Sequence, residues 1–279
     1  MIASNRSHRP GAIALALAVP IAIFLLAPLL AVIPISLTPA RFLSMPTKAI
    51  SFRHYETLVT DPAWRSAALV SLRVAAASAG LSVVFAALFS IGLWLARPRF
   101  GALLLGFVLM PMVVPPVVSA MVLYFLLTFL SGLQPWIAYD TEPGLVLAHV
   151  VMNTPFAVVL FLVALAGVDR RIDLAARGLG ASLARRAFQI VLPNLRHVLA
   201  GALVMTFVLS WDETSVALFV TSVDAVTLPR LMWMGLRDNI DPAVAAASVV
   251  LTLLTVTALV GRSLVRRFAA GSSSESRHG

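Results

Sequence analysis

We predict an all-α integral membrane protein with six transmembrane helices, from three features of the sequence. Of its 279 residues, 60% are hydrophobic and only 12% are charged, and the mean hydropathy is +0.95. Soluble domains are about 25% charged and 45–50% apolar. The apolar residues form runs long enough to cross a bilayer, and the basic residues lie at the ends of these runs. This composition excludes a disordered chain, and the absence of cysteine excludes disulfides and thiol catalysis.

Six apolar segments are long enough to be membrane spans. A spanning helix needs about 20 residues, because the hydrocarbon core is about 30 Å thick and each helical residue rises about 1.5 Å. The six segments are Ala12–Ile35, Ala67–Ala96, Ala102–Leu130, Gly144–Val168, Val198–Thr221 and Pro242–Leu264. The first is about twice as long as the apolar core of a secretory signal, so we expect it to be retained.

Basic residues predict the orientation of the chain. The amino-terminal tail, residues 97–99, the loop 169–197 and the carboxyl-terminal end carry fourteen arginines, whereas the opposite loops carry six basic residues. Cytoplasmic loops are enriched in Lys and Arg, so both termini are expected in the cytoplasm. Tails 1–11 and 265–279 would then flank a membrane domain over residues 12–264. This topology accounts for the net charge of +9 and the pI of about 11.4 without nucleic-acid binding.

The motifs of common enzyme sites are missing from the sequence. A P-loop needs glycines followed by Lys and Ser or Thr, but the only lysine, Lys48, precedes Ala49. Neither a His-Glu-x-x-His motif nor a Gly-x-Ser-x-Gly elbow occurs. His149 and Asn153 lie one turn apart, a pattern typical of hydrogen bonds between membrane helices. We therefore expect no catalytic residue, metal ligand or cofactor site in this chain.

Two carboxylates interrupt the fifth predicted span. Asp212 and Glu213 follow Trp211, about 21 Å from the cytoplasmic end of that segment. A carboxylate at this depth must face water or a partner. One interpretation makes the three residues part of a pathway for a cationic solute. The other pairs the carboxylates with Arg73 or with a neighbouring subunit.

Two further patterns in the predicted spans concern helix shape and packing. Prolines predict kinks in the third and fourth spans, at Pro111, Pro115, Pro116 and Pro155. Small residues recur every four positions in the second span, at Ser78, Ser82, Ala86 and Ser90. Small residues at this spacing let helices approach closely, so we interpret this stripe as a packing surface.

The loop between the fourth and fifth spans is the most informative segment. Its apolar residues Ile172, Ala175 or Ala176, Leu179 and Leu183 lie at helical spacing, so they predict a short amphipathic helix. The nearby residues Gly178 and Gly180 would allow a sharp turn. Composition alone favours an arginine-rich helix lying on anionic lipid.

The spacing within this loop resembles the "EAA" motif of ABC importer permeases. That motif reads Glu-Ala-Ala, three residues, Gly, nine residues, Ile, one residue, Leu-Pro. The matching residues here are Ala175, Ala176, Gly180, Ile190, Leu192 and Pro193, while Leu174 occupies the position of the glutamate. Asp173 lies one residue earlier, and whether it takes the place of that glutamate is open. The likeness covers about residues 50–265, and Trp211-Asp212-Glu213 with Leu228-Pro229 resembles the spermidine/putrescine permease branch.

This resemblance implies a type I ABC importer permease in the bacterial inner membrane. Such a permease pairs with a second permease, identical or different, and with a periplasmic solute-binding protein. Two copies of a separate ATPase would bind ATP and Mg²⁺, so this chain itself would not be an enzyme. The ATPase would dock on the 169–197 loop, at Asp173, Ala175, Ala176, Gly180, Ala181, Ile190, Leu192 and Pro193. The implied solute is a polyamine, and the alternative solutes are thiamine, ferric iron, phosphonate or an opine. A less favoured alternative for the protein itself is an ion-coupled secondary transporter.

Overall fold

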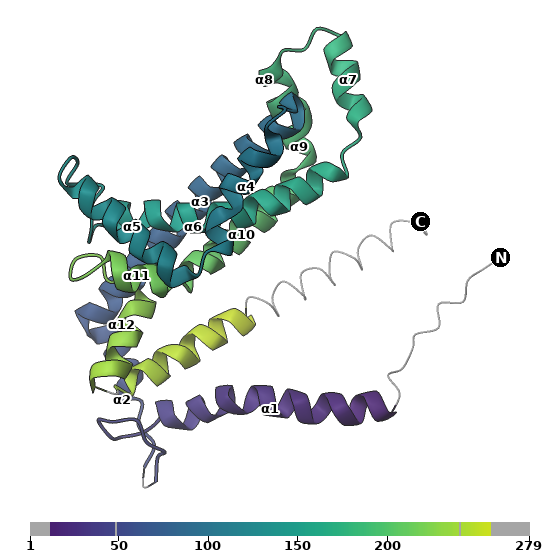
Figure 1. The fold of residues 1–279 in the computed structure, drawn as a ribbon. Helices are drawn as coiled ribbons and strands as arrows, with labels where there is room; N and C mark the ends of the chain where they lie inside the picture. The colour runs from purple at the N-terminus through teal and green to yellow at the C-terminus, as the bar shows by residue number, and fades with distance from the viewer. Residues whose placement is uncertain (1–11, 48, 240, 258–279) are drawn as a thin grey trace, which may run out of the picture. The chain divides into compact units, whose positions relative to one another are not determined.

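The computed structural model describes residues 12–47, 49–239 and 241–257 (Figure 1). Regular secondary structure in these ranges is entirely helical, as predicted. The chain divides into two compact units, one formed by Met1–Pro62 with Met234–Gly279 and the other by Ala63–Trp233. The predicted tails, residues 1–11 and 265–279, lie outside the described residues.

The first unit contains the first predicted span and a short helix that the sequence analysis missed. Helix α1 covers Ala12–Ser36, and α2 covers Arg53–Thr60 within the predicted loop. The Ser36 hydroxyl lies 2.7 Å from the Tyr55 hydroxyl, which connects the end of α1 to α2. A π-helical turn, η2, covers Gly235–Asn239, and an apolar helix covers Ala243–Thr257. The remainder of the sixth predicted span, residues 258–264, is outside the described residues.

Two uninterrupted helices carry the second and fourth predicted spans. Helix α3 covers Pro62–Ala96 and α6 covers Glu142–Ala166, and both are long and apolar enough to cross a membrane. The small-residue stripe of α3 is buried at all four positions, which confirms its interpretation as a packing surface. On this face the Ser78 hydroxyl donates to Ser210, which is also hydrogen-bonded to His149 Nδ1 at 2.6 Å. His149 therefore makes an interhelical hydrogen bond, as its position predicted.

The third predicted span is bent at Pro115, one of the positions where the sequence predicts a kink, and the bend divides it into two helices. Helix α4 covers Gly101–Val113, α5 covers Pro116–Ser131, and the two are bent by 105°. A residue before proline is restricted to extended conformations, and Val114 indeed has a ψ of 136°. Pro116 begins α5, where its missing N–H is not needed.

The fifth predicted span is also broken. Helix α10 covers Arg196–Trp211, and α11 covers Ser215–Val220 after a break at residues 212–214. On its other side, α10 is bent by 75° from the helical segment Leu183–Asn194. The described residues therefore contain three candidate spans, or five if each bent pair is one span, besides the shorter helix Ala243–Thr257. The count of six and the cytoplasmic termini remain predictions.

The core of the second unit consists of two apolar clusters. One joins the carboxyl-terminal halves of α3 and α6 to the start of α10, through Trp94, Phe161, Leu165 and Ala202. The other joins the amino-terminal halves of α3 and α6 to α5 and α11, through Val74, Leu127, Leu145 and Val216. Since α3 and α6 enter both clusters, they form the common frame between the two ends of this unit (Figure 1).

Asp140, in the connection between α5 and α6, holds the turn that follows α11. Its backbone is left-handed, with φ at 60°. Its carboxylate accepts backbone N–H groups from Ser222 at 2.6 Å and Val223 at 2.8 Å, and more distantly from Asp224 and Ala225. Burial opposes ionisation of Asp140, but these hydrogen bonds outweigh it and lower the pKa of the carboxyl group.

Replacing Asp140 should loosen the 222–225 turn. We expect Asp140→Ala to increase hydrogen exchange of the turn amides about tenfold or more, because hydrogen bonds to a charged acceptor are worth about 1.5–3 kcal/mol. Asp140→Asn tolerates the left-handed backbone and isolates the effect of charge. Since folding lowers this pKa, the protection is fully present above the unfolded value of about 3.9 and is lost as pH falls through the lower pKa of the folded protein. Equal exchange in the wild type and in Asp140→Ala would contradict this assignment.

Candidate functional site

The loop between α6 and α10 folds into a chain of short helices at one end of the second unit (Figure 1). Helix α7 covers Arg170–Gly178, α8 covers Leu183–Arg185, a π-helical turn η1 covers Arg186–Val191, and α9 covers Leu192–Asn194. The Asp169 carboxylate caps α7 by accepting the Arg171 N–H at 2.8 Å. The predicted turn depends on Gly180 alone, whose φ is 77°, because Gly178 is the last residue of α7.

Two arginines attach α7 to the end of α3. Arg170 donates to the Trp94 carbonyl at 2.6 Å, and its guanidinium lies 4.0 Å from the centre of the Trp94 ring. Arg177 donates to the next carbonyl, that of Leu95, at 3.0 Å. The last carbonyls of a helix have no intrahelical hydrogen-bond donor and carry partial negative charge. An arginine supplies both the missing donor and a positive charge. Burial, followed by the positive charge of Arg97, lowers the pKa of Arg170.

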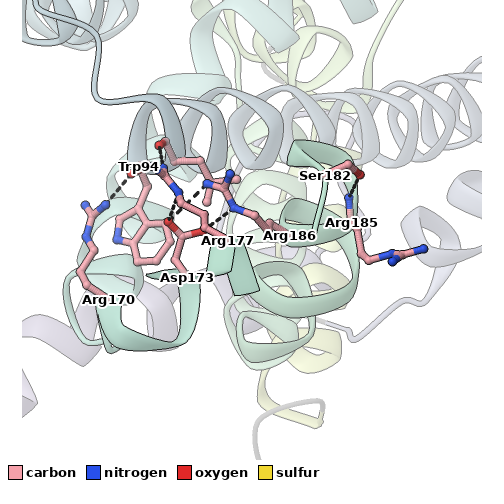
Figure 2. Close-up of polar contacts among 8 residues, drawn as sticks. Trp94, Arg170, Asp173, Arg177, Ser182, Arg185 and Arg186 are labelled. Carbon is pink, nitrogen blue, oxygen red and sulfur yellow. Dashed lines mark hydrogen bonds and ion pairs between the residues drawn. The ribbon is translucent and has the colours of Figure 1, made fainter. Parts of the chain in front are cut away.

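Asp173 lies on the inner face of α7 and forms the buried ion pair of the loop. Its two carboxylate oxygens accept from Arg186 Nε at 2.6 Å and Arg186 Nη2 at 3.3 Å. Arg177, one helical turn along α7, places its Nε 3.2 Å from Asp173 Oδ2. Figure 2 shows the Asp173 carboxylate facing both arginines. Asp173 and Arg186 are both buried, so this pair connects α7 to η1 from within the loop.

Large apolar side chains are exposed on α7 and in the segment that follows it. Leu174, at the position of the motif glutamate, is 63% exposed, and Leu179 is 89% exposed. Ile172, Leu183 and Phe188 are also exposed, whereas Ala176 is buried against the loop. The predicted short helix is present over Arg170–Gly178, but Leu179 and Leu183 lie beyond its end, and Ala176 is buried while Ile172 is exposed. We call the exposed apolar residues Ile172, Leu174, Leu179, Leu183 and Phe188 together the apolar loop face; Arg171 and Arg185 are exposed beside them.

The remaining motif residues surround the bend into α10. Ala175 and Pro193 are exposed, and Ala181, Ile190 and Leu192 are half-buried. Their neighbours Val191 and Leu195 are almost fully buried in the cluster that contains Trp94 and Phe161. Pro193 cannot donate a backbone hydrogen bond to the preceding turn, where the helix widens into η1. The motif spacing thus places a bend between the loop and α10.

The residues of the predicted solute pathway lie at the break between α10 and α11, in a different part of the second unit. Asp212 is exposed, and Glu213 accepts the Val216 N–H at 3.0 Å at the start of α11. Trp211 stacks on Phe207 with a ring-centre distance of 5.9 Å. The ion pair of Arg73 is with Glu142, at 2.7 Å, so the predicted pairing of Arg73 with the Asp212–Glu213 carboxylates is wrong.

Sequence reasoning missed the residues that attach the loop to the rest of the unit. Trp94 was assigned only to a span, and Arg170, Arg177 and Arg186 were interpreted by their charge. The signal for Arg177 was its spacing of four residues from Asp173, typical of an ion pair along a helix. Nothing local in the sequence indicates the pairing of Asp173 with Arg186, which are thirteen positions apart. Among the described residues, no group of three His, Asp or Glu side chains could hold a metal ion.

Removing the Asp173 carboxylate should destabilise the loop. In Asp173→Ala, the buried Arg186 charge loses its partner, which costs about 3–5 kcal/mol for a buried pair. Arg177→Ala removes a more exposed pair and its bond to Leu95, so we expect a smaller cost, of about 1 kcal/mol. Limited proteolysis of the loop in the membrane-embedded chain would measure both effects.

The paired variant Asp173→Leu with Arg186→Met serves as the control. Apolar residues of similar volume often replace a buried ion pair without loss of stability. We therefore expect this double variant to resist cleavage better than Asp173→Ala. Equal cleavage of the wild type and Asp173→Ala would show that the ion pair does not hold the loop.

Comparisons with known proteins agree with this architecture. Two crystal structures of a bacterial ABC transporter that imports the acidic polysaccharide alginate contain chains with the same fold. One has a TM-score of 0.66 at 16% identity and covers 96% of this chain and 99% of its own. The other, a complex with an alginate pentasaccharide-bound periplasmic protein, has a TM-score of 0.66 at 17% identity. It covers 92% of this chain and 93% of its own.

Similar sequences are permeases. The putrescine transport system permease protein PotI of Escherichia coli K12 is 29% identical over 250 residues, which are 88% of this chain and 87% of PotI. The spermidine/putrescine permease PotC of the same strain is 28% identical over 247 residues, or 88% and 90% of the two chains. A "Probable molybdenum ABC transporter permease protein" of Haloferax volcanii is 28% identical over 227 residues, or 79% and 84%.

Residues 88–270 match the family described as binding-protein-dependent transport system inner membrane component. This match covers more than half of the chain and includes α6, α7, α10 and the whole loop between them. The chain is a multi-pass inner-membrane protein with the type I importer permease fold, and it belongs to the permease family of binding-protein-dependent ABC transporters.

Proposed function

We propose that this permease couples to a separate ATPase through the 169–197 loop. The observation that carries this proposal is the apolar loop face, since Leu174 and Leu179 are largely exposed on a loop that is rich in arginine. Large exposed apolar patches on a protein surface are typical of interaction sites. A groove on the ATPase that accepts α7 would bury these side chains.

The contacts of α7 give a physical route for coupling. ATP-driven closure of two ATPase subunits would displace α7, and Arg170 and Arg177 would pass this displacement to α3. The Asp173–Arg186 pair would pass it to η1 and then through α9 to α10. Buried cores transmit small displacements because they are close-packed. The loop would in this way drive alternating access of the solute pathway, and this chain would perform no chemistry itself.

The other partners follow from family membership. A second permease, identical or different, would complete the solute pathway, and the ATPase pair would bind ATP and Mg²⁺. A periplasmic solute-binding protein would deliver the solute, which is supported by the family description and by the structural neighbour solved with its periplasmic protein.

We propose a polyamine such as putrescine or spermidine as the solute. The relatives PotI and PotC are polyamine permeases by name and align with nearly the whole chain. The exposed Asp212 carboxylate at the α10–α11 break would attract a cationic solute. The similarity to a probable molybdenum permease supports a second candidate function, in which the same class of importer carries a different small solute.

A charge at Ala176 should uncouple ATP from transport. Ala176 is buried at the base of α7, so Ala176→Glu would place an unpaired carboxylate there and displace the helix. In proteoliposomes with the partner subunits, we expect ATP-driven uptake to fall at least tenfold. The matched control is Ala184→Glu, because Ala184 is exposed in the same loop but lies outside the motif positions and the apolar loop face, so uptake should stay near the wild-type rate. Uptake driven by an ion gradient and indifferent to ATP would instead support the secondary transporter.

Neutralising the two carboxylates tests the solute assignment separately. With Asp212→Asn and Glu213→Gln combined, we expect the KM for putrescine uptake to rise about tenfold, because a charged hydrogen bond is worth about 1.5–3 kcal/mol. ATPase activity without solute should be unchanged. Unaltered uptake kinetics would remove these residues from the pathway.

A further inference from the structure

We propose that a groove between α3 and α6 binds a phospholipid of the ethanolamine type, with the headgroup at the Arg73–Glu142 ion pair. The groove has a volume of about 660 Å³. On α3 it is lined by Arg73, Ala77, Leu81 and Phe85, which recur every fourth residue and therefore share one helix face. On α6 the lining includes Glu142, Val146 and Val150. Its lining is thus polar at one end and apolar along the rest.

The polar end lies at the depth of a lipid headgroup. Arg73 is 23 residues from the end of α3, or about 35 Å, whereas the hydrocarbon core is about 30 Å thick. The end of α3 is held by arginines of the loop, which places it at the opposite membrane surface. Glu142 begins α6, and the exposed Trp136 also lines the groove. Tryptophan is enriched at membrane–water interfaces, so all three residues indicate the same level.

The groove has the length of one leaflet. Arg73 and Phe85 are twelve residues apart, or about 18 Å along α3, and half of the hydrocarbon core is about 15 Å. An acyl chain lying over Ala77 and Leu81 would therefore end near Phe85. In the predicted orientation this is the outer leaflet, because the arginine-rich loop is at the other end.

The charges of the groove match those of a zwitterionic headgroup. Arg73 donates to Glu142 through one N–H at 2.7 Å and is 61% exposed, so its other donors can reach a phosphate. The second oxygen of the Glu142 carboxylate can accept from an ammonium group. A phosphoethanolamine headgroup supplies both charges. Phosphatidylcholine has no N–H to donate, and phosphatidylglycerol has no cation to place beside Glu142.

The size of the side chains that line the groove favours a lipid chain over a partner helix. Close helix pairs in membranes use small residues, and α3 buries its small-residue stripe within its own unit. The groove face instead exposes Leu81 and Phe85. A flexible acyl chain can fill the irregular space between such side chains.

Native mass spectrometry of the full chain, purified with its partner subunits from bilayers of defined composition, would test this proposal. The probes are palmitoyl-oleoyl phosphatidylethanolamine, phosphatidylcholine and phosphatidylglycerol, which share the same acyl chains. We expect about tenfold greater retention of the ethanolamine lipid than of the other two, in line with one charged hydrogen bond. Arg73→Gln should abolish this retention, and Glu142→Gln should remove the preference over phosphatidylcholine. Leu81→Trp should lower the retention of every lipid.

The matched control is Arg65→Gln, which removes another exposed arginine of α3 that does not line the groove. This variant should retain the lipid like the wild type. Exposed ion pairs contribute little to folding, so the Arg73 and Glu142 variants should assemble normally. Equal retention by the wild type and Arg73→Gln would overturn the proposal. Cross-linking of Leu81→Cys to the second permease would also overturn it, by showing that a protein occupies the groove.

Discussion

The buried ion pair between Asp173 and Arg186 determines the shape of the loop on which the functional account depends. It fixes α7 against η1, although the two are joined by a turn that only Gly180 makes possible. With the carboxylate occupied inside the loop, Leu174 on α7 and Leu179 directly after it remain exposed. Arg170 and Arg177 then attach the same helix to the last carbonyls of α3. Arg170, Arg177 and Arg186 thus serve as internal connections, and the surface offered to a partner carries Leu174 and Leu179 beside the exposed Arg171 and Arg185.

A second constraint comes from the membrane, where each backbone polar group must be satisfied within the protein. Two predicted spans are nevertheless broken, at Pro115 and at Asp212. At each break, the helix that follows begins with a backbone N–H group that is either absent or hydrogen-bonded to a nearby side chain. Pro116 has no N–H to satisfy at the start of α5, and Glu213 accepts a backbone N–H at the start of α11. These breaks shorten α5 and α10 and let α11 pack on α5, away from the loop.

Much of this fold could be predicted because hydropathy and motif spacing are local properties of the sequence. The apolar runs located α1, α3 and α6 within a few residues, and the motif spacing located the loop and its glycine turn. The prolines predicted a bend in the third span, although not that it would divide the helix in two. The break at residues 212–214 was missed because an apolar run has the same hydropathy whether or not its helix is continuous. The Asp173–Arg186 pair joins residues on different helices, so its geometry depends on tertiary packing, which no local pattern encodes.

The central claim, that the apolar loop face docks an ATPase, is tested most directly by affinity purification. The chain would be purified in mild detergent from its native host, and its partners identified by mass spectrometry. We predict recovery of a P-loop ATPase with the wild type and its loss with Leu174→Asp combined with Leu179→Asp, since both side chains are exposed and their replacement should not disturb folding. Equal recovery of the ATPase with the wild type and the variant would contradict the claim, as would purification of the chain alone under conditions that preserve other importers.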